Sequence, residues 1–191
     1  MNCLQLQRGA LMIEVLVTIA ILAIGLVGLL QTQGRLQKSE MESYQRTQAL
    51  ILLNDMASRI STNRANAVDY VTTTFLGVGG EVACTSTGTE LQEVDSREWC
   101  EALQGAAETI ASSGVGAMVG ARGCVEEVVA GSQYMVTVVW QGLIPVSAPP
   151  VTVTCGAGLY DVPAGSACAD NPGKCRRHVT TKVRLANLDS I

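Results

Sequence analysis

The sequence predicts an α+β protein in which a long N-terminal helix packs on a small antiparallel sheet. An apolar run near the N-terminus continues into a segment with no proline before Pro145, which favours one long helix. Two later runs alternate between the two faces expected of strands. With 191 residues and 48% hydrophobic content, the chain suits one modest domain plus an apolar segment.

The apolar run extends from Leu11 to Leu30. A helix of about 20 residues rises roughly 30 Å and can cross a bilayer. Arg8 is the only charged side chain ahead of it, so the positive-inside rule leaves the C-terminal end outside the cytoplasm. We therefore expect a single-pass inner-membrane protein with a periplasmic globular part.

Two features of this run are unusual. Glu14 lies inside it, where a carboxylate costs a few kcal/mol and usually signals a partner. The small residues typical of a cleavage site, Gly9 and Ala10, precede the run instead of following it. A cut between them would place the new amino group at i, i+4 spacing from Glu14. The alternative is an uncleaved signal anchor whose acid reaches toward the headgroups.

Gln31 to Ile60 is compatible with continuation of the same helix. Ala49, Leu53, Met56 and Ile60 recur on one face, an apolar stripe suited to a sheet. Ser61 to Tyr70 closes the helix, and Val71 to Leu91 is expected to be an irregular loop. The predicted divisions are 1–9 as leader, 10–30 as apolar helix, 31–66 as amphipathic helix and 67–191 as globular head.

A second helix is predicted after a capping box at Asp95-Ser96-Arg97-Glu98. Its apolar face would comprise Trp99, Leu103, Ala107 and Ile110, and it would end by Gly114.

Strands are predicted over Tyr134–Gln141 and His178–Leu185, with shorter candidates at Val125–Ala130 and Val151–Thr154. These segments make a meander of three or four antiparallel strands the economical sheet.

Seven cysteines are present, and none forms a CxxC pair that would indicate zinc. Removal of a leader would take Cys3 with it and leave six, which allow 15 connectivities. Proximity in the sequence suggests Cys84 with Cys100, Cys124 with Cys155, and Cys168 with Cys175. Such disulfides fit an oxidising compartment.

The net charge of -4 gives no general attraction to nucleic acid. Cations nevertheless gather near the C-terminal end of the chain. DNA, an acidic neighbouring subunit and no ligand at all are open alternatives for them, and a solvated strand face is the favoured interpretation. The residues are Lys174, Arg176, Arg177, Lys182 and Arg184, with His178 among them.

No nucleophile elbow, Walker loop, HExxH or dinucleotide fingerprint is present. We therefore expect neither an enzyme nor a cofactor. Asp161, Asp170 and Asn171 lack the spacing of an EF-hand and suit turns, so no metal is expected.

Arg8-Gly9 followed by Ala10 to Val17 resembles the class III leader junction of type IV pilins and type II secretion pseudopilins. The resemblance implies that a prepilin peptidase cuts after Gly9 and N-methylates Ala10, and that Glu14 docks the subunit during assembly. It also implies a pilin fold. Ala10 stands where the family usually has phenylalanine.

Four further segments resemble PilV-type minor pilins, in the same order: Gln48 to Tyr70, Glu98-Trp99, Tyr134 to Trp140, and the terminal strand before Arg184-Leu185. This resemblance implies a minor subunit of a type IV pilus, or fimbrium, that serves twitching motility. It would join other minor pilins, the major pilin and the inner-membrane assembly platform, and would prime assembly or occupy the filament tip. A minor pseudopilin, a DNA-uptake pilin and a membrane-anchored domain unrelated to filaments are the alternatives.

Overall fold

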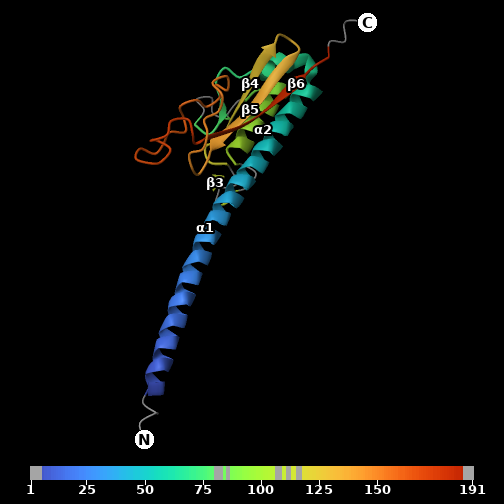
Figure 1. Cartoon of the computed structure of the whole chain (residues 1–191). Coiled ribbons are helices and arrows are strands. Elements are labelled where there is room, and N and C mark those ends of the chain that lie inside the picture. Colours follow the sequence, from blue (N-terminus) through green and yellow to red (C-terminus); the bar gives the residue numbers. More distant parts are fainter. Residues whose placement is uncertain are drawn as a thin grey trace. The chain divides into compact units, whose positions relative to one another are not determined.

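A computed structural model describes residues 6–79, 84, 87–105, 109–110, 113–114 and 118–186. The chain forms two compact units, Met1–Met41 and Glu42–Ile191. The second is called the folded unit below. Helix α1, Leu6–Thr62, belongs to both, and it is the long ribbon that runs from blue to teal in Figure 1.

In the first unit α1 exposes its apolar side chains. Every large apolar side chain from Met12 to Leu30 is at least 53% exposed. This part of α1 is long and apolar enough to cross a membrane. The predicted apolar run is thus helical throughout.

In the folded unit the same helix supplies one wall of the core. The predicted stripe is confirmed, because Ala49, Leu53, Met56 and Ile60 are all at most 3% exposed. They join one hydrophobic cluster with residues of the sheet, including Tyr134, Val136, Val138 and Val183. This arrangement, a long helix packed on a small antiparallel sheet, is the predicted α+β fold and is consistent with a pilin-like fold.

The main sheet has the order β1-β4-β5-β6, and all its neighbours are antiparallel. Its strands are β1 at Leu76–Gly77, β4 at Arg122–Val129, β5 at Gln133–Gln141 and β6 at Arg176–Arg184. The two long predicted strands are confirmed, and the shorter candidate Val125–Ala130 lies largely in β4. A separate pair joins β2, Thr109–Ile110, to β3, Ser113–Gly114.

The prediction of a strand at Val151–Thr154 is wrong, because these residues form a turn and irregular backbone. Pro149 and Pro150 precede it and have no N–H to donate to a ladder, and the Val153 N–H closes a turn onto the Pro150 carbonyl. Val151 is 95% exposed. Conversely, β1 lies within the stretch from Val71 to Leu91 that was expected to be irregular throughout.

Helix α2 extends over Leu91–Leu103 and begins earlier than predicted. Its capping box is formed by Glu90 and Glu93, so Asp95 and Glu98 lie inside the helix. The helix ends before Gly105, whose φ of 84° suits a glycine. Ile110 belongs to β2, and the predicted face residue Ala107 lies outside the described residues.

At its own C-terminal end α1 stops at Thr62 and passes through Asn63 into the 3-10 helix η1, Arg64–Tyr70. Ala67 and Tyr70 are the buried residues of η1. The turn therefore brings Tyr70 back onto the core.

Candidate functional site

The first candidate site is the uncovered apolar part of α1. Glu14 lies on it with an exposed side chain and is the only charged residue between Met12 and Gly34. Gly9 and Ala10 belong to the same helix, so the backbone places Ala10 one turn before Glu14. The side chain of Ala10 lies outside what the structure describes. An exposed apolar surface of this extent is stable only against lipid or other apolar helices.

Within the folded unit, a polar cluster ties α1 to α2. The guanidinium of Arg59 binds Asp55 at 3.0 Å, Asp95 at 2.7 Å and Glu98 at 2.8 Å. Burial by itself would lower the pKa of Arg59, but the hydrogen bonds to Glu98 and Asp95 raise it above its ordinary value. The arginine is therefore permanently charged and holds three carboxylates from two helices.

Tyr70 completes this cluster from η1. Its hydroxyl donates to the second carboxylate oxygen of Asp95 and accepts from the side-chain amide of Asn63. Burial, followed by the bond to Asp95, raises the pKa of Tyr70 to about 12. The buried Asp95 carboxylate is thus paired on both oxygens, which offsets the free energy of removing it from water.

Trp99 is the central side chain between α1 and the sheet and has no exposed surface. Its indole N–H donates to the Leu52 carbonyl of α1 at 2.9 Å. Its ring lies directly over Gly123 of β4, where a Cβ would come within 2.2 Å of it. The glycine is therefore required by the close approach of the indole.

On the opposite face of the sheet a disulfide-bonded loop covers β4 and β5. Cys124 of β4 is joined to Cys155, and these cysteines pack with Val139 and Tyr160. Arg176, only 7% exposed, donates to the carbonyls of Val153 and Cys155 at 2.8 and 2.6 Å. The arginine thus fastens the loop to the start of β6.

Arg122 reinforces the same loop. Its guanidinium lies between two aromatic rings, 5.0 Å from the centroid of Phe75 and 4.9 Å from that of Tyr160. The Tyr160 hydroxyl donates to the Gly120 carbonyl at 2.8 Å. Cation–π contacts of this kind contribute about 0.5–2 kcal/mol each, depending on desolvation.

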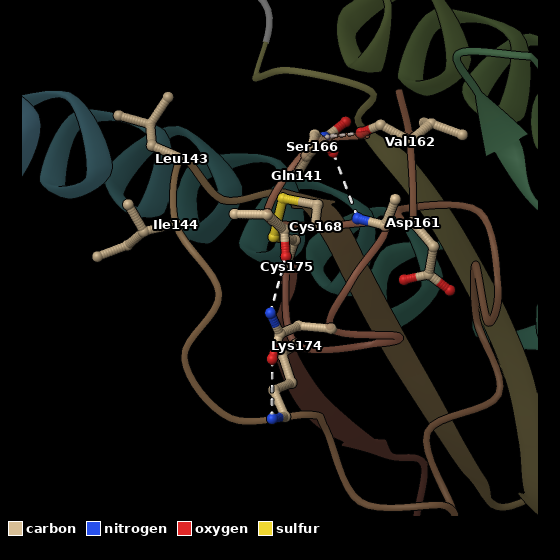
Figure 2. The surroundings of a disulfide bond; sticks show 12 residues. Gln141, Leu143, Ile144, Asp161, Val162, Ser166, Cys168, Lys174 and Cys175 are labelled. Atoms are coloured by element: carbon tan, nitrogen blue, oxygen red, sulfur yellow. Dashed lines mark hydrogen bonds between the residues drawn. A yellow bond between two sulfur atoms is a disulfide. The ribbon is translucent and has the colours of Figure 1, made fainter. Parts of the chain in front are cut away.

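A second disulfide, Cys168–Cys175, closes a short loop before β6. Figure 2 shows this bond and the side chains of Leu143 and Ile144, which extend away from it. The Asp161 carboxylate accepts from the Gly173 N–H at 2.7 Å. Asp161 is therefore occupied by a backbone donor, in keeping with the turn role expected from the sequence.

The third disulfide joins Cys84 to Cys100 of α2. The structure thus contains the three pairs that proximity suggested.

The C-terminal cations do not form one surface. Arg176 is buried in the loop contact, and Arg177 binds Glu42 of α1 at 3.2 Å and the Ile144 carbonyl at 2.8 Å. Lys174 donates to the side chain of Asn171. Lys182 and Arg184 are exposed on β6.

Burial and the nearby charge of Arg176 lower the pKa of His178 below its ordinary value, which favours the neutral imidazole. The expected basic patch is therefore reduced to Lys182 and Arg184.

A cavity of about 210 Å³ opens beside the Cys124–Cys155 bond. Thr72, Thr73, Thr74 and Glu126 contribute polar groups to it. Glu126 already accepts from the Thr154 hydroxyl at 2.8 Å. Across the described parts of the chain, no three His, Cys, Asp or Glu side chains are grouped to hold a metal ion.

Sequence reasoning missed the cluster of Arg59, Asp95 and Tyr70 and the roles of Arg122 and Arg176. A buried arginine looks like a surface arginine when its partners are carbonyls or rings distant in the sequence. One signal was available: Asp95 and Glu98 lie one turn apart and could share a cation on a helix face.

No protein-family model, curated protein or solved structure matches the chain.

Proposed function

We propose that this chain is a minor pilin of the PilV type, a structural subunit of a type IV pilus that acts by binding other subunits. It would be cut between Gly9 and Ala10, N-methylated on Ala10 and held in the inner membrane by α1 with the folded unit in the periplasm. It would then enter a complex with other minor pilins that primes assembly.

The observation that supports this proposal most is the composition of α1 along its length. One continuous helix carries an exposed apolar segment with a single acid, Glu14, and then supplies the stripe from Ala49 to Ile60 to a core. A membrane anchor needs the first feature alone, and a globular domain needs the second alone. A filament subunit stored in the membrane and packed by its helix needs both.

Glu14 has a clear role under this proposal. A carboxylate in an apolar surface is stabilised by a cation that reaches it without water. The methylated amino group of Ala10, in this subunit or a neighbour, is such a cation. Pairing of these groups would set the axial register of one subunit against the next.

The test is mass analysis of the N-terminal peptide from native membranes, with and without the host prepilin peptidase. We expect a chain that begins at methylated Ala10 only when the peptidase is present. A chain that retains its N-terminal residues in both strains would refute the proposal and leave an uncleaved signal anchor.

A second experiment separates a pilus from a type II secretion system. Deletion of the gene should remove surface pili and twitching and leave secretion intact. Loss of secretion with normal pili would assign the chain to the minor pseudopilins.

A matched pair of variants tests the acid itself. Glu14→Gln retains shape without charge and should abolish assembly while the protein stays in the membrane. Glu14→Asp retains the charge and should preserve part of the function. Equal assembly by wild type and Glu14→Gln would remove the proposed role of the acid.

A further inference from the structure

Strand β6 is an edge of the main sheet. The order β1-β4-β5-β6 gives it one neighbour, β5, with which it pairs over its full length from Arg176 to Arg184. At nine residues it is much longer than β1, the two-residue strand at the other edge. A free edge of this length is a ready template for another strand.

The backbone hydrogen bonds show which groups of β6 face outward. The Gly142 N–H donates to the Cys175 carbonyl and the Leu185 N–H donates to the Ser132 carbonyl. Hydrogen-bonded pairs alternate along an antiparallel ladder. Arg177, Val179, Thr181 and Val183 therefore bond to β5, whereas the peptide groups of His178, Thr180, Lys182 and Arg184 point away from it.

These four outward residues have no backbone partner within the described ranges. Thr180, Lys182 and Arg184 are also exposed. Neither Lys182 nor Arg184 forms an ion pair with a described residue. Among the residues of β4, β5 and β6 on that face of the sheet, the one acid is Glu126, which lies two strands away opposite Met135 and is bonded to Thr154.

We propose that the edge of β6 receives an extended acidic segment of another protein as an added strand. Backbone groups of Thr180 and its outward neighbours would bind the segment in β-augmentation. Lys182 and Arg184, two residues apart on one face, would pair with acids at alternate positions of that segment. Charged residues on an edge also deter indiscriminate pairing, so here they restrict the partner to an acidic one.

A second copy of this chain fits the edge poorly. Antiparallel pairing of two β6 strands centred on Thr180 would oppose Arg184 to Arg176. A centre at Lys182 would oppose that lysine to itself. Like charges directly opposite one another are destabilising, so the charge pattern favours a different, acidic chain.

The inference does not rest on the proposed function, because β6 lies in the folded unit and Glu14 does not. Its test uses the full chain in a zwitterionic detergent and a fluorescent eight-residue peptide in which valine and glutamate alternate. A matched peptide has lysine in place of glutamate. We expect binding of the glutamate peptide with at least a tenfold preference over the lysine peptide, measured by fluorescence anisotropy.

Two variants at one position isolate the backbone contribution. Thr180→Pro removes an outward N–H without a loss in the β5 ladder, as proline is tolerated on the solvent side of an edge strand. It should weaken peptide binding at least tenfold. Thr180→Val retains the N–H and should bind as wild type does. Equal binding by the two variants would overturn the proposal.

The charge contribution has an independent test, which also serves if Thr180→Pro does not fold. The double variant Lys182→Glu/Arg184→Glu should reverse the preference and bind the lysine peptide at least tenfold better. No reversal, or no binding of either peptide to wild type, would overturn the proposal. Sedimentation that shows self-association lost in Thr180→Pro would assign the edge to a second copy and would overturn it as well.

Discussion

Gly123→Ala should destabilise the folded unit, because the added methyl group would overlap the indole ring of Trp99. The added Cβ would lie 2.2, 2.6 and 2.8 Å from three ring carbons. Cβ atoms essentially never come this close to another heavy atom, and the ring is rigid and fully buried. The indole therefore has to move away from β4.

The loss in the free energy of unfolding follows from two consequences of that movement. Overpacking of a core costs about 1–3 kcal/mol. A displaced indole also loses its 2.9 Å hydrogen bond to the Leu52 carbonyl, and a buried donor left without a partner costs about 1–3 kcal/mol. Alanine restricts the unfolded chain more than glycine does, which recovers roughly 0.5–1 kcal/mol. The middle of these ranges gives a net loss of about 3 kcal/mol.

The assay is urea unfolding of the full chain in detergent, followed by tryptophan fluorescence. A double-mutant cycle with Trp99→Leu supplies the control, since the smaller side chain leaves room for the methyl group. In that background Gly123→Ala should cost less than about 1 kcal/mol, because the clash is absent. If Gly123→Ala lowers the free energy of unfolding equally in both backgrounds, or only slightly in wild type, the steric clash with Trp99 is not the cause.

Three further predictions concern the hydrogen bonds and the disulfide. The neutral phenol of Tyr70, with its pKa raised to about 12, stabilises the fold fully below about pH 10 and loses this effect as pH rises through 12. The difference in unfolding free energy between wild type and Tyr70→Phe should thus narrow by about 2 kcal/mol from pH 9 to 12, and a constant difference would contradict the assignment. Arg176→Met leaves the carbonyls of Val153 and Cys155 without their donor, and limited proteolysis should cut this loop several-fold faster than in wild type; unchanged cleavage would show that the arginine does not fasten it. Replacement of Cys124 and Cys155 by serine removes the cross-link between residues 31 positions apart in the sequence. On the loop-entropy argument the free energy of unfolding should fall by about 3–4 kcal/mol, as measured by thermal unfolding. Reduced wild type is the control, and its stability should fall at least as far.

The elements found from sequence alone are those specified by local periodicity. The stripe from Ala49 to Ile60 repeats with a helical period, and the residues of β5 and β6 alternate between two faces. Each pattern therefore indicates which of its own residues are buried. The start of α2 was misplaced because Asp95 resembles a cap. Its carboxylate is used instead by Arg59 and Tyr70, which no local pattern records.

In the candidate sites, too, sequence identified only the residues that carry a local signal. Glu14 was identified because an acid in an apolar run is anomalous wherever the run lies. The basic residues were grouped by proximity in sequence, but alternation along β6 places Arg177 on the other face from Lys182 and Arg184, and the loop over the sheet buries Arg176. Two of the cations serve loop and helix contacts that depend on tertiary structure.

The shared core of α1 and β6 also bears on how the protein is made. Val183 packs in the same cluster as Ala49 and Met56, although these residues leave the ribosome long before it. Contacts of such high sequence separation form late, so the apolar stripe is exposed from its own synthesis until the final strand has been made. The folded unit is consequently vulnerable to aggregation and proteolysis throughout its synthesis, and a chaperone that shields the stripe during that interval would raise the yield.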